Sequence, residues 1–182
     1  MDIPTIVIIL CWITFLLYWL TQSFGAKPVA EQPRQRWPLV GIVMMAILLI
    51  FNQPLATQWY QPTNLTGLIA DVLGLSGLAI TLWARGTLGT NWSGSVTLKK
   101  NHQLITSGPY HYVRHPIYSG LLTLILGTAI LLGRASTFVA FILCIIMLYV
   151  KAREEEHLLT AHFPKEYPSY KKRVHALIPF IL

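Results

Sequence analysis

Long apolar stretches without charge dominate the chain, and short polar connections separate them. Asp, Glu, Lys, Arg and His are absent from residues 3–26, 37–70, 116–133 and 135–150. Uncharged apolar stretches of about 18 residues or more are typical of membrane-spanning helices. We therefore expect an all-α integral membrane protein with five transmembrane helices, at residues 3–24, 37–58, 65–84, 116–132 and 136–151.

The first apolar stretch resembles a secretory signal in position but not in pattern. Asp2 is the one charged residue before it, and the stretch is longer than the 7–15 residues typical of a signal's apolar region. We therefore expect a retained helix. We expect residues 1–84 to form a three-helix membrane region and residues 85–182 the catalytic region, within a single structural domain.

The basic residues are distributed unevenly among the connections. With five helices, the first and third connections and the tail fall on one side of the membrane, and they hold 13 of the 14 Lys and Arg residues. Cytoplasmic segments carry the excess of Lys and Arg in membrane proteins. The pattern predicts an external N-terminus and a cytoplasmic C-terminus. It also accounts for the net charge of +7 without a nucleic-acid partner.

Two polar motifs flank the last apolar hairpin. The stretch Gly108-Pro-Tyr-His-Tyr-Val-Arg-His-Pro-Ile-Tyr-Ser-Gly120 precedes it, and Glu154-Glu155-Glu156 follows it. Pro116 suits the first turn of a helix, so His115 is expected at a helix mouth. Titratable groups close to lipid are costly and mark functional sites. We therefore interpret the two motifs as halves of one active site at the cytoplasmic surface, formed by the loop before the fourth helix and the C-terminal tail.

Three other polar or thiol groups lie within apolar stretches. Asp71 stands near the start of the third predicted helix, where an acid is stabilised by the helix dipole, although an intramembrane acid is also a candidate functional group. Cys11 and Cys144 lie in separate apolar stretches, a pattern that indicates neither a disulfide nor a metal site.

These motifs, in this order and spacing, resemble the isoprenylcysteine carboxyl methyltransferases. The matching residues cover about 85–182 and comprise His102-x-Leu104-Ile105, Gly108-Pro109-Tyr110, Arg114-His115-Pro116-x-Tyr118-x-Gly120, Glu155-Glu156-x-x-Leu159 and Phe163-x-x-x-Tyr167-x-x-Tyr170. The related phospholipid N-methyltransferases share the Arg-His-Pro and Glu-Glu parts. The resemblance implies methyl transfer from S-adenosyl-L-methionine to a lipophilic acceptor, with the carboxyl oxygen of a prenylated cysteine as the best candidate.

The resemblance also implies roles for individual residues. The cofactor-binding residues would be His102, Gln103, Leu104, Ile105, Tyr110, His115, Pro116, Ile117, Tyr118 and Glu155. Catalytic roles would fall to Lys151, Arg153 and Glu156, with no metal. The family has an arginine where this chain has Lys151, and lysine lacks the two-pronged geometry with which arginine binds a carboxylate. Glu156 or His157 would serve as a base if the acceptor were an amine.

Other functions remain open from the residues. Phospholipid amines and small thiols are alternative methyl acceptors. A different class is an NADPH-dependent lipid reductase, which would bind NADPH instead of a methyl donor. The i, i+4 spacing of His111 and His115 suits a di-iron site, but the chain has six scattered histidines, too few for such a site. A non-catalytic membrane protein is the remaining alternative.

Overall fold

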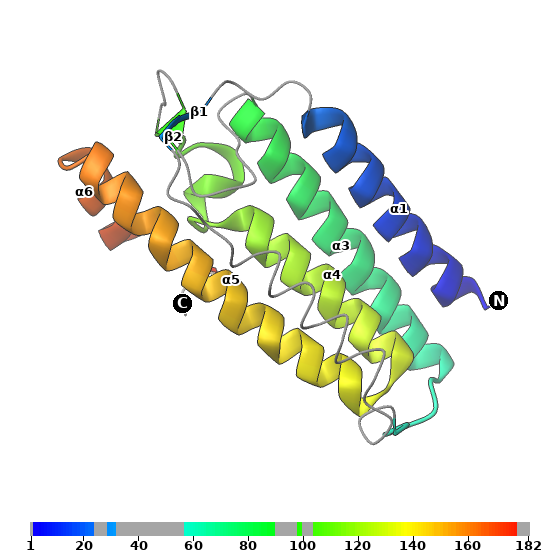
Figure 1. Cartoon of the computed structure of the whole chain (residues 1–182). Coiled ribbons are helices and arrows are strands. Elements are labelled where there is room, and N and C mark those ends of the chain that lie inside the picture. The colour runs from blue at the N-terminus through cyan, green and yellow to red at the C-terminus, as the bar shows by residue number, and fades with distance from the viewer. Residues whose placement is uncertain (1, 24–28, 32–56, 90–97, 100–103, 178–182) are drawn as a thin grey trace.

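Four long helices lie side by side in the computed structural model, which describes residues 2–23, 29–31, 57–89, 98–99 and 104–177. They are α1 (Ile3–Ser23), α3 (Asn64–Leu88), α4 (Pro116–Leu132) and α5 (Ala135–His162). Shorter elements are the 3-10 helix η3 (Gly108–His111), helix α6 (Glu166–Arg173) and two strands, β1 (Val29–Glu31) and β2 (Leu98–Lys99). Figure 1 shows α3 and α4 between α1 and α5. The all-α prediction is confirmed, with one short strand pair added.

Local sequence sets the ends of α3 and α4. The Thr63 side chain accepts a hydrogen bond from the backbone N–H of Thr66 at the start of α3, and Thr66 returns the contact, which forms a capping box. Pro116 is the first residue of α4, as predicted. Gly133 ends α4 in the left-handed conformation, with a φ of 60°, and α5 begins two residues later.

Among the described residues, three helices are long and apolar enough to cross a membrane. They are α1, α3 and α5, whereas α4 is apolar but only 17 residues long. The chain is thus a multi-pass integral membrane protein. The second predicted helix, at 37–58, lies almost wholly outside the described residues. Its predicted end is too late, because Gln58 pairs with Arg134 in an isolated β-bridge.

The helix that contains the fifth predicted span, 136–151, extends well beyond that span. Helix α5 continues through Glu154–Glu156 to His162 and has 28 residues. Charged residues stop an apolar pattern but not a helix, because lysine, arginine, glutamate, leucine and alanine are all strong helix formers. The three glutamates therefore stand on the continuous helix α5.

Small residues let α3 and α4 approach closely. A Cβ added at Gly77 would lie 2.6 Å from the carbonyl oxygen of Gly120 and 2.6 Å from the backbone nitrogen of Leu124. Close backbone approach at glycines is the usual way in which membrane helices gain packing contacts. Helix α1 packs on the other side of this pair, where the indole of Trp12 donates a hydrogen bond to Thr128 Oγ1 at 3.0 Å.

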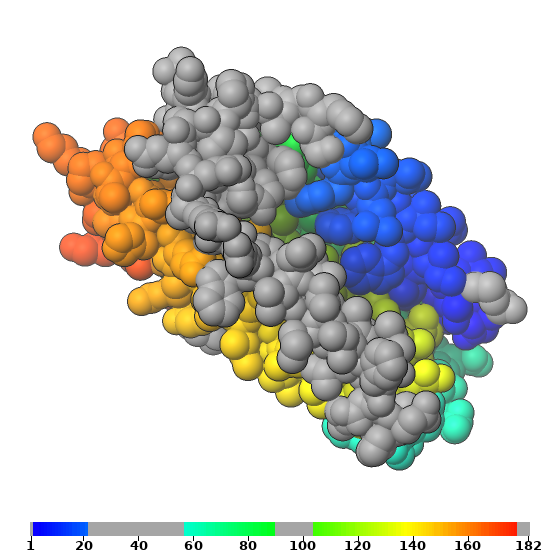
Figure 2. Space-filling view, viewed as in Figure 1, coloured from blue at the N-terminus to red at the C-terminus, as the bar shows by residue number. Residues whose placement is uncertain are grey.

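The connections sort to opposite ends of the bundle. Strand β1, from the first connection, pairs antiparallel with β2, from the third, and Val113 forms a parallel bridge with His175 of the tail. The Gln58–Arg134 bridge joins the second and fourth connections. The odd connections and the tail therefore meet at one end, as five spans require. Figure 2, in the same view as Figure 1, shows the C-terminal part of α5 and α6 at this end in orange to red.

Candidate active site

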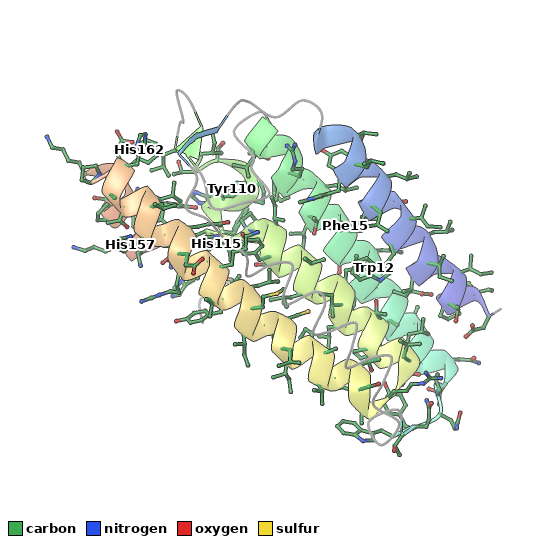
Figure 3. The ribbon with its side chains drawn as sticks, viewed as in Figure 1. Trp12, Phe15, Tyr110, His115, His157 and His162 are labelled. Atoms are coloured by element: carbon green, nitrogen blue, oxygen red, sulfur yellow. The ribbon has the colours of Figure 1, made fainter. Side chains whose placement is uncertain are left out.

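His115 stands between Glu155 and Glu156 of α5. It is the residue before α4, and its ring Nδ1 lies 3.4 Å from Glu155 Oε2 while Nε2 lies 3.4 Å from Glu156 Oε1. The Tyr118 hydroxyl donates a hydrogen bond to Glu155 Oε1 at 2.5 Å. The His115 and Tyr118 rings stack with centroids 5.4 Å apart. Figure 3 shows His115 between α4 and α5, so the hairpin brings both predicted motifs together.

The two neighbouring acids have different surroundings. The Glu156 side chain is 2% exposed, and its Oε1 accepts a hydrogen bond from Arg114 Nε at 2.7 Å. Its Oε2 lies 2.7 Å from the Lys171 ammonium group. Glu155 is 23% exposed and contacts His115 and Tyr118. Glu156 is thus occupied by cations of the chain, whereas Glu155 keeps an open side toward a ligand.

The C-terminal tail closes over this cluster. The backbone N–H groups of Arg114 and His115 donate to the carbonyls of His175 and Ala176 at 2.8 and 2.9 Å. The Arg114 guanidinium also donates to the Val174 carbonyl. A single arginine therefore ties the tail to α5 through Glu156, which makes the tail part of the site.

Tyr110 of η3 is buried, and α6 holds it in place. Its carbonyl oxygen accepts a hydrogen bond from the Tyr170 hydroxyl at 2.5 Å. Burial raises the pKa of Tyr170 to about 12, although Arg114 works against this rise. The Tyr170 hydroxyl is therefore protonated at neutral pH and remains a donor.

The charge state of His115 follows from its two acidic neighbours. Burial lowers the pKa of His115, but hydrogen bonds and charge attraction from Glu155 and Glu156 raise it more. The net pKa lies above the usual value of an imidazole. A positively charged His115 would offset the negative charge of the paired acids.

The structure places the other predicted residues as follows. Leu104 and Ile105 are half-buried in the segment before η3, Pro116 is buried and Ile117 is half-buried, while His102 and Gln103 lie outside the described residues. The Lys151 ammonium lies 5.4 Å from the centre of the Tyr118 ring, at the edge of the cluster. Arg153 is exposed and lines a cavity between α5 and α6.

Three residues of the cluster were not predicted as site residues: Arg114, Tyr170 and Lys171. Arg114 directly precedes His115 in the motif, which was the available signal for it. Tyr170 and Lys171 act from α6, where Tyr170 meets Tyr110 across 60 residues of chain and Lys171 meets Glu156 of the preceding helix. Nothing in their local pattern indicates which acid or carbonyl they meet.

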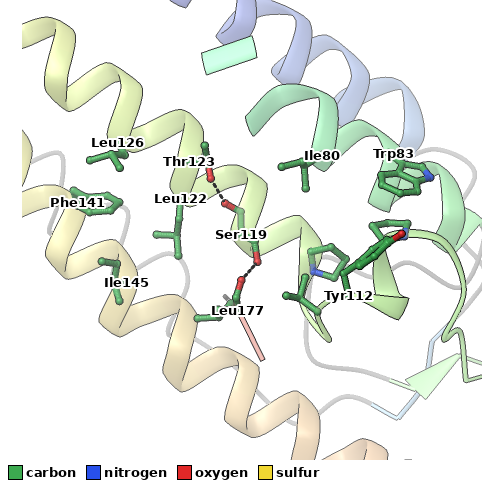
Figure 4. A pocket seen from close by; sticks show the side chains of 13 residues that line it. Ile80, Trp83, Tyr112, Ser119, Leu122, Thr123, Leu126, Phe141, Ile145 and Leu177 are labelled. Carbon is green, nitrogen blue, oxygen red and sulfur yellow. Dashed lines mark hydrogen bonds between the residues drawn. The ribbon is translucent and has the colours of Figure 1, made fainter. Parts of the chain in front are cut away.

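An apolar cavity of about 470 Å³ adjoins the cluster between α3, α4 and α5. Its lining includes Pro116 and Val113, which are close neighbours of His115 in sequence, and Leu177 of the tail. Figure 4 shows the remaining walls, with Ile80 and Trp83 from α3, Leu122 and Leu126 from α4, and Phe141 and Ile145 from α5. Pockets of about 300–1,000 Å³ with mostly apolar walls suit small or lipid-like ligands.

Comparison with known proteins finds relatives across most of the chain. The probable protein-S-isoprenylcysteine O-methyltransferase of Oryza sativa subsp. indica is 32% identical over 73% of this chain and 68% of its own. The human protein-S-isoprenylcysteine O-methyltransferase is 35% identical over 65% of this chain and 42% of its own. The cobalt-zinc-cadmium resistance protein CzcN of Cupriavidus metallidurans is 30% identical over 79% of this chain and 62% of its own.

A solved structure and a family profile agree with these relatives. The structure of the eukaryotic intramembrane Ras methyltransferase ICMT matches with a TM-score of 0.57 and 25% identity, over 82% of this chain and 55% of that one. The matching segments cover between 42% and 68% of the length of these relatives. The profile of the isoprenylcysteine carboxyl methyltransferase family matches residues 70–161, which include α4 and both acids of the cluster. The chain therefore belongs to the isoprenylcysteine carboxyl methyltransferase family, whose members use S-adenosyl-L-methionine.

Proposed function

We propose that this protein transfers a methyl group from S-adenosyl-L-methionine to the carboxylate of a prenylated cysteine or a similar lipophilic acid. The observation that carries the proposal is the division between the two acids, with Glu156 neutralised inside the protein and Glu155 left accessible. Family membership and the apolar cavity beside the cluster support it.

The donor set near Glu155 fits the cofactor. An accessible carboxylate, oriented by the Tyr118 hydroxyl and by His115, suits the ammonium group of an amino-acid moiety. The aromatic faces of Tyr118 and Tyr110 suit the cationic sulfonium. When bound, the cofactor supplies an activated methyl group. The residues that would hold it are Tyr110, His115, Tyr118 and Glu155, together with the segment at 102–105.

The acceptor would be held by two features. Its prenyl chain would occupy the apolar cavity, which ends at Pro116 and Leu177 close to His115. Its carboxylate would meet Lys151, whose ammonium lies over the Tyr118 ring. Lysine supplies a positive charge but lacks the planar guanidinium group with which arginine binds a carboxylate through two hydrogen bonds. We therefore expect weaker selection of carboxylate geometry than in enzymes with arginine at this position.

The chain's own groups contribute by position more than by proton transfer. A carboxylate acceptor is already anionic and needs no base. Glu156 is poorly suited to that role, because Arg114 and Lys171 both bind it. For an amine acceptor, His157 is therefore the better candidate of the two predicted bases. Closure by the tail would exclude water and align donor with acceptor.

The topology completes the proposal. The cluster lies at the end of the bundle where the odd connections and the tail meet. With most Lys and Arg residues at this end, the positive-inside rule assigns it to the cytoplasm and the N-terminus to the outside. In this proposal, residues 1–84 form a membrane region and residues 85–182 form the catalytic region, within one structural domain.

The test combines cofactor binding with product formation. Calorimetric titration with S-adenosylhomocysteine should give micromolar binding to the wild type and at least tenfold weaker binding to Glu155→Gln. Glu154→Gln is the matched control, since it removes a neighbouring charge on the same helix. With labelled S-adenosylmethionine, N-acetyl-S-farnesylcysteine should yield a base-labile ester, whereas its methyl ester and phosphatidylethanolamine should not react. Labelled phosphatidylethanolamine or an unreactive farnesylcysteine would overturn the proposed acceptor.

A further inference from the structure

A second cavity, of about 410 Å³, lies between the C-terminal part of α5 and α6. Its walls are Arg153, Glu156, His157, Thr160, Ala161 and Lys171, and it shares no lining residue with the apolar cavity. We call it the basic cavity. Figure 3 shows His157 farther along α5 toward α6 than the level of His115. The basic cavity therefore shares Glu156 and Lys171 with the cluster proposed for methyl transfer, but it includes neither Glu155 nor Tyr118.

The charge of the basic cavity favours an anion. Glu156 is the one acid in its wall, and Arg114 and Lys171 lie 2.6 and 2.7 Å from the carboxylate oxygens. These two cations more than offset that acid. Arg153 and His157 are exposed and lie four residues apart, on one face of α5. Guanidinium and ammonium groups on two sides of a hollow suit a phosphate.

The position of the basic cavity along α5 matches the level of lipid headgroups. Arg153 is 18 residues from Ala135, the first residue of α5. At about 1.5 Å per residue, Arg153 lies roughly 27 Å along the helix. The hydrocarbon core of a bilayer is about 30 Å thick. If α5 starts at the opposite face of the membrane, its cationic residues reach the surface where phosphates are found.

An exposed apolar stripe leads directly to the basic cavity. Ile142, Ile146 and Val150 are 54%, 55% and 48% exposed. At about 100° per residue, these three side chains, Arg153 and His157 fall within an arc of about 80° on α5. One face of α5 is thus apolar for two turns and then carries Arg153 and His157, an order that matches the acyl chain and then the phosphate of a phospholipid.

We propose that the basic cavity binds the phosphate of an anionic phospholipid, with an acyl chain along Ile142, Ile146 and Val150. The lipid would hold the end of α5 and α6 at the cytoplasmic surface. Lys171 would link this lipid to Glu156, since it borders the cavity and binds that acid. The lipid site shares Glu156 and Lys171 with the cluster, but Arg153 and His157 are not among the residues proposed to hold the cofactor, so lipid binding is tested separately from methyl transfer.

The test titrates dihexanoyl phosphatidylglycerol into the full-length protein in a neutral detergent and measures the dissociation constant. Each cation near an anionic surface contributes a factor of about five to binding. Arg153→Gln should therefore weaken binding about fivefold, and Arg153→Gln combined with His157→Gln should weaken it further. Arg173→Gln is the matched control, because Arg173 is exposed on α6 but does not line the cavity. It should leave the dissociation constant unchanged.

Two further ligands separate the possible sources of the phosphate. Glycerol 3-phosphate, which lacks acyl chains, and dihexanoyl phosphatidylcholine, which is zwitterionic, should both bind at least tenfold more weakly. Equal weakening by Arg153→Gln and Arg173→Gln would overturn the site and leave general surface attraction. Glycerol 3-phosphate binding as tightly as the lipid would overturn a lipid as the occupant.

Discussion

Removal of the Glu156 carboxylate should destabilise the protein far more than its single charge suggests. Arg114 is 9% exposed and lies 2.6–2.7 Å from Glu156, which is 2% exposed. In Glu156→Ala, the arginine keeps its bond to the Val174 carbonyl but loses its counter-charge. Breaking a buried pair by removing one partner costs about 3–5 kcal/mol. The contact with Lys171 adds little, because Lys171 is 39% exposed and exposed pairs contribute about 0–1 kcal/mol.

The assay is a double-mutant cycle on the free energy of unfolding in mixed micelles with increasing dodecyl sulfate. The cycle compares Glu156→Ala, Arg114→Met and the double variant. Residues in one buried network usually show coupling of about 0.5–3 kcal/mol, and we expect the upper half of this range here. The double variant should then be less destabilised than the sum of the single variants, because it leaves no charge buried alone.

Lys171→Met is the matched control, since it removes the exposed partner of the same carboxylate. It should cost less than about 1 kcal/mol. Hydrogen exchange tests the tail directly. The backbone amides at 174–177 should lose protection in Glu156→Ala and keep it in Lys171→Met. Additive effects of Glu156→Ala and Arg114→Met, or an equal cost for Lys171→Met, would refute the view that Arg114 and Glu156 form the main link to the tail.

Two further predictions concern packing and pH. Gly77→Ala should lower stability by about 1–3 kcal/mol, because the new Cβ would lie 2.6 Å from the Gly120 carbonyl oxygen. At Gly86 the nearest atom would lie 3.9 Å from the new Cβ, which is an ordinary contact, so Gly86→Ala should raise stability by up to about 1 kcal/mol. Thermal unfolding of both variants decides this, and equal effects would contradict it. The raised pKa of His115 predicts that its ion-pair stabilisation is complete below about pH 6.5 and is lost as the pH rises through the raised value. Melting temperature between about pH 6 and 9 should fall less in His115→Gln than in the wild type, and parallel curves would contradict the assignment.

Helix positions were largely predictable from the chain, and one difference shows the limit. The start of α1 and both ends of α4 match the predicted residues, because apolar length, Pro116 and Gly133 mark them locally. The predicted fifth span ends at residue 151, where the charges begin, whereas α5 ends 11 residues later at His162. Helix propensity, which does not depend on polarity, decides how far α5 extends.

The sequence by itself determined that His115, Tyr118 and the paired acids belong to one site, because two motifs at the ends of a short hairpin must meet. Only the tertiary structure decided which acid is buried against cations of the chain and which remains partly exposed. Glu155 and Glu156 are adjacent and chemically identical, but a helix turns by about 100° per residue, so their side chains face different neighbours. Arg114 and Lys171 reach Glu156 alone, from a loop and from α6. Long-range contacts of this kind distinguish two like residues, and no local pattern carries that information.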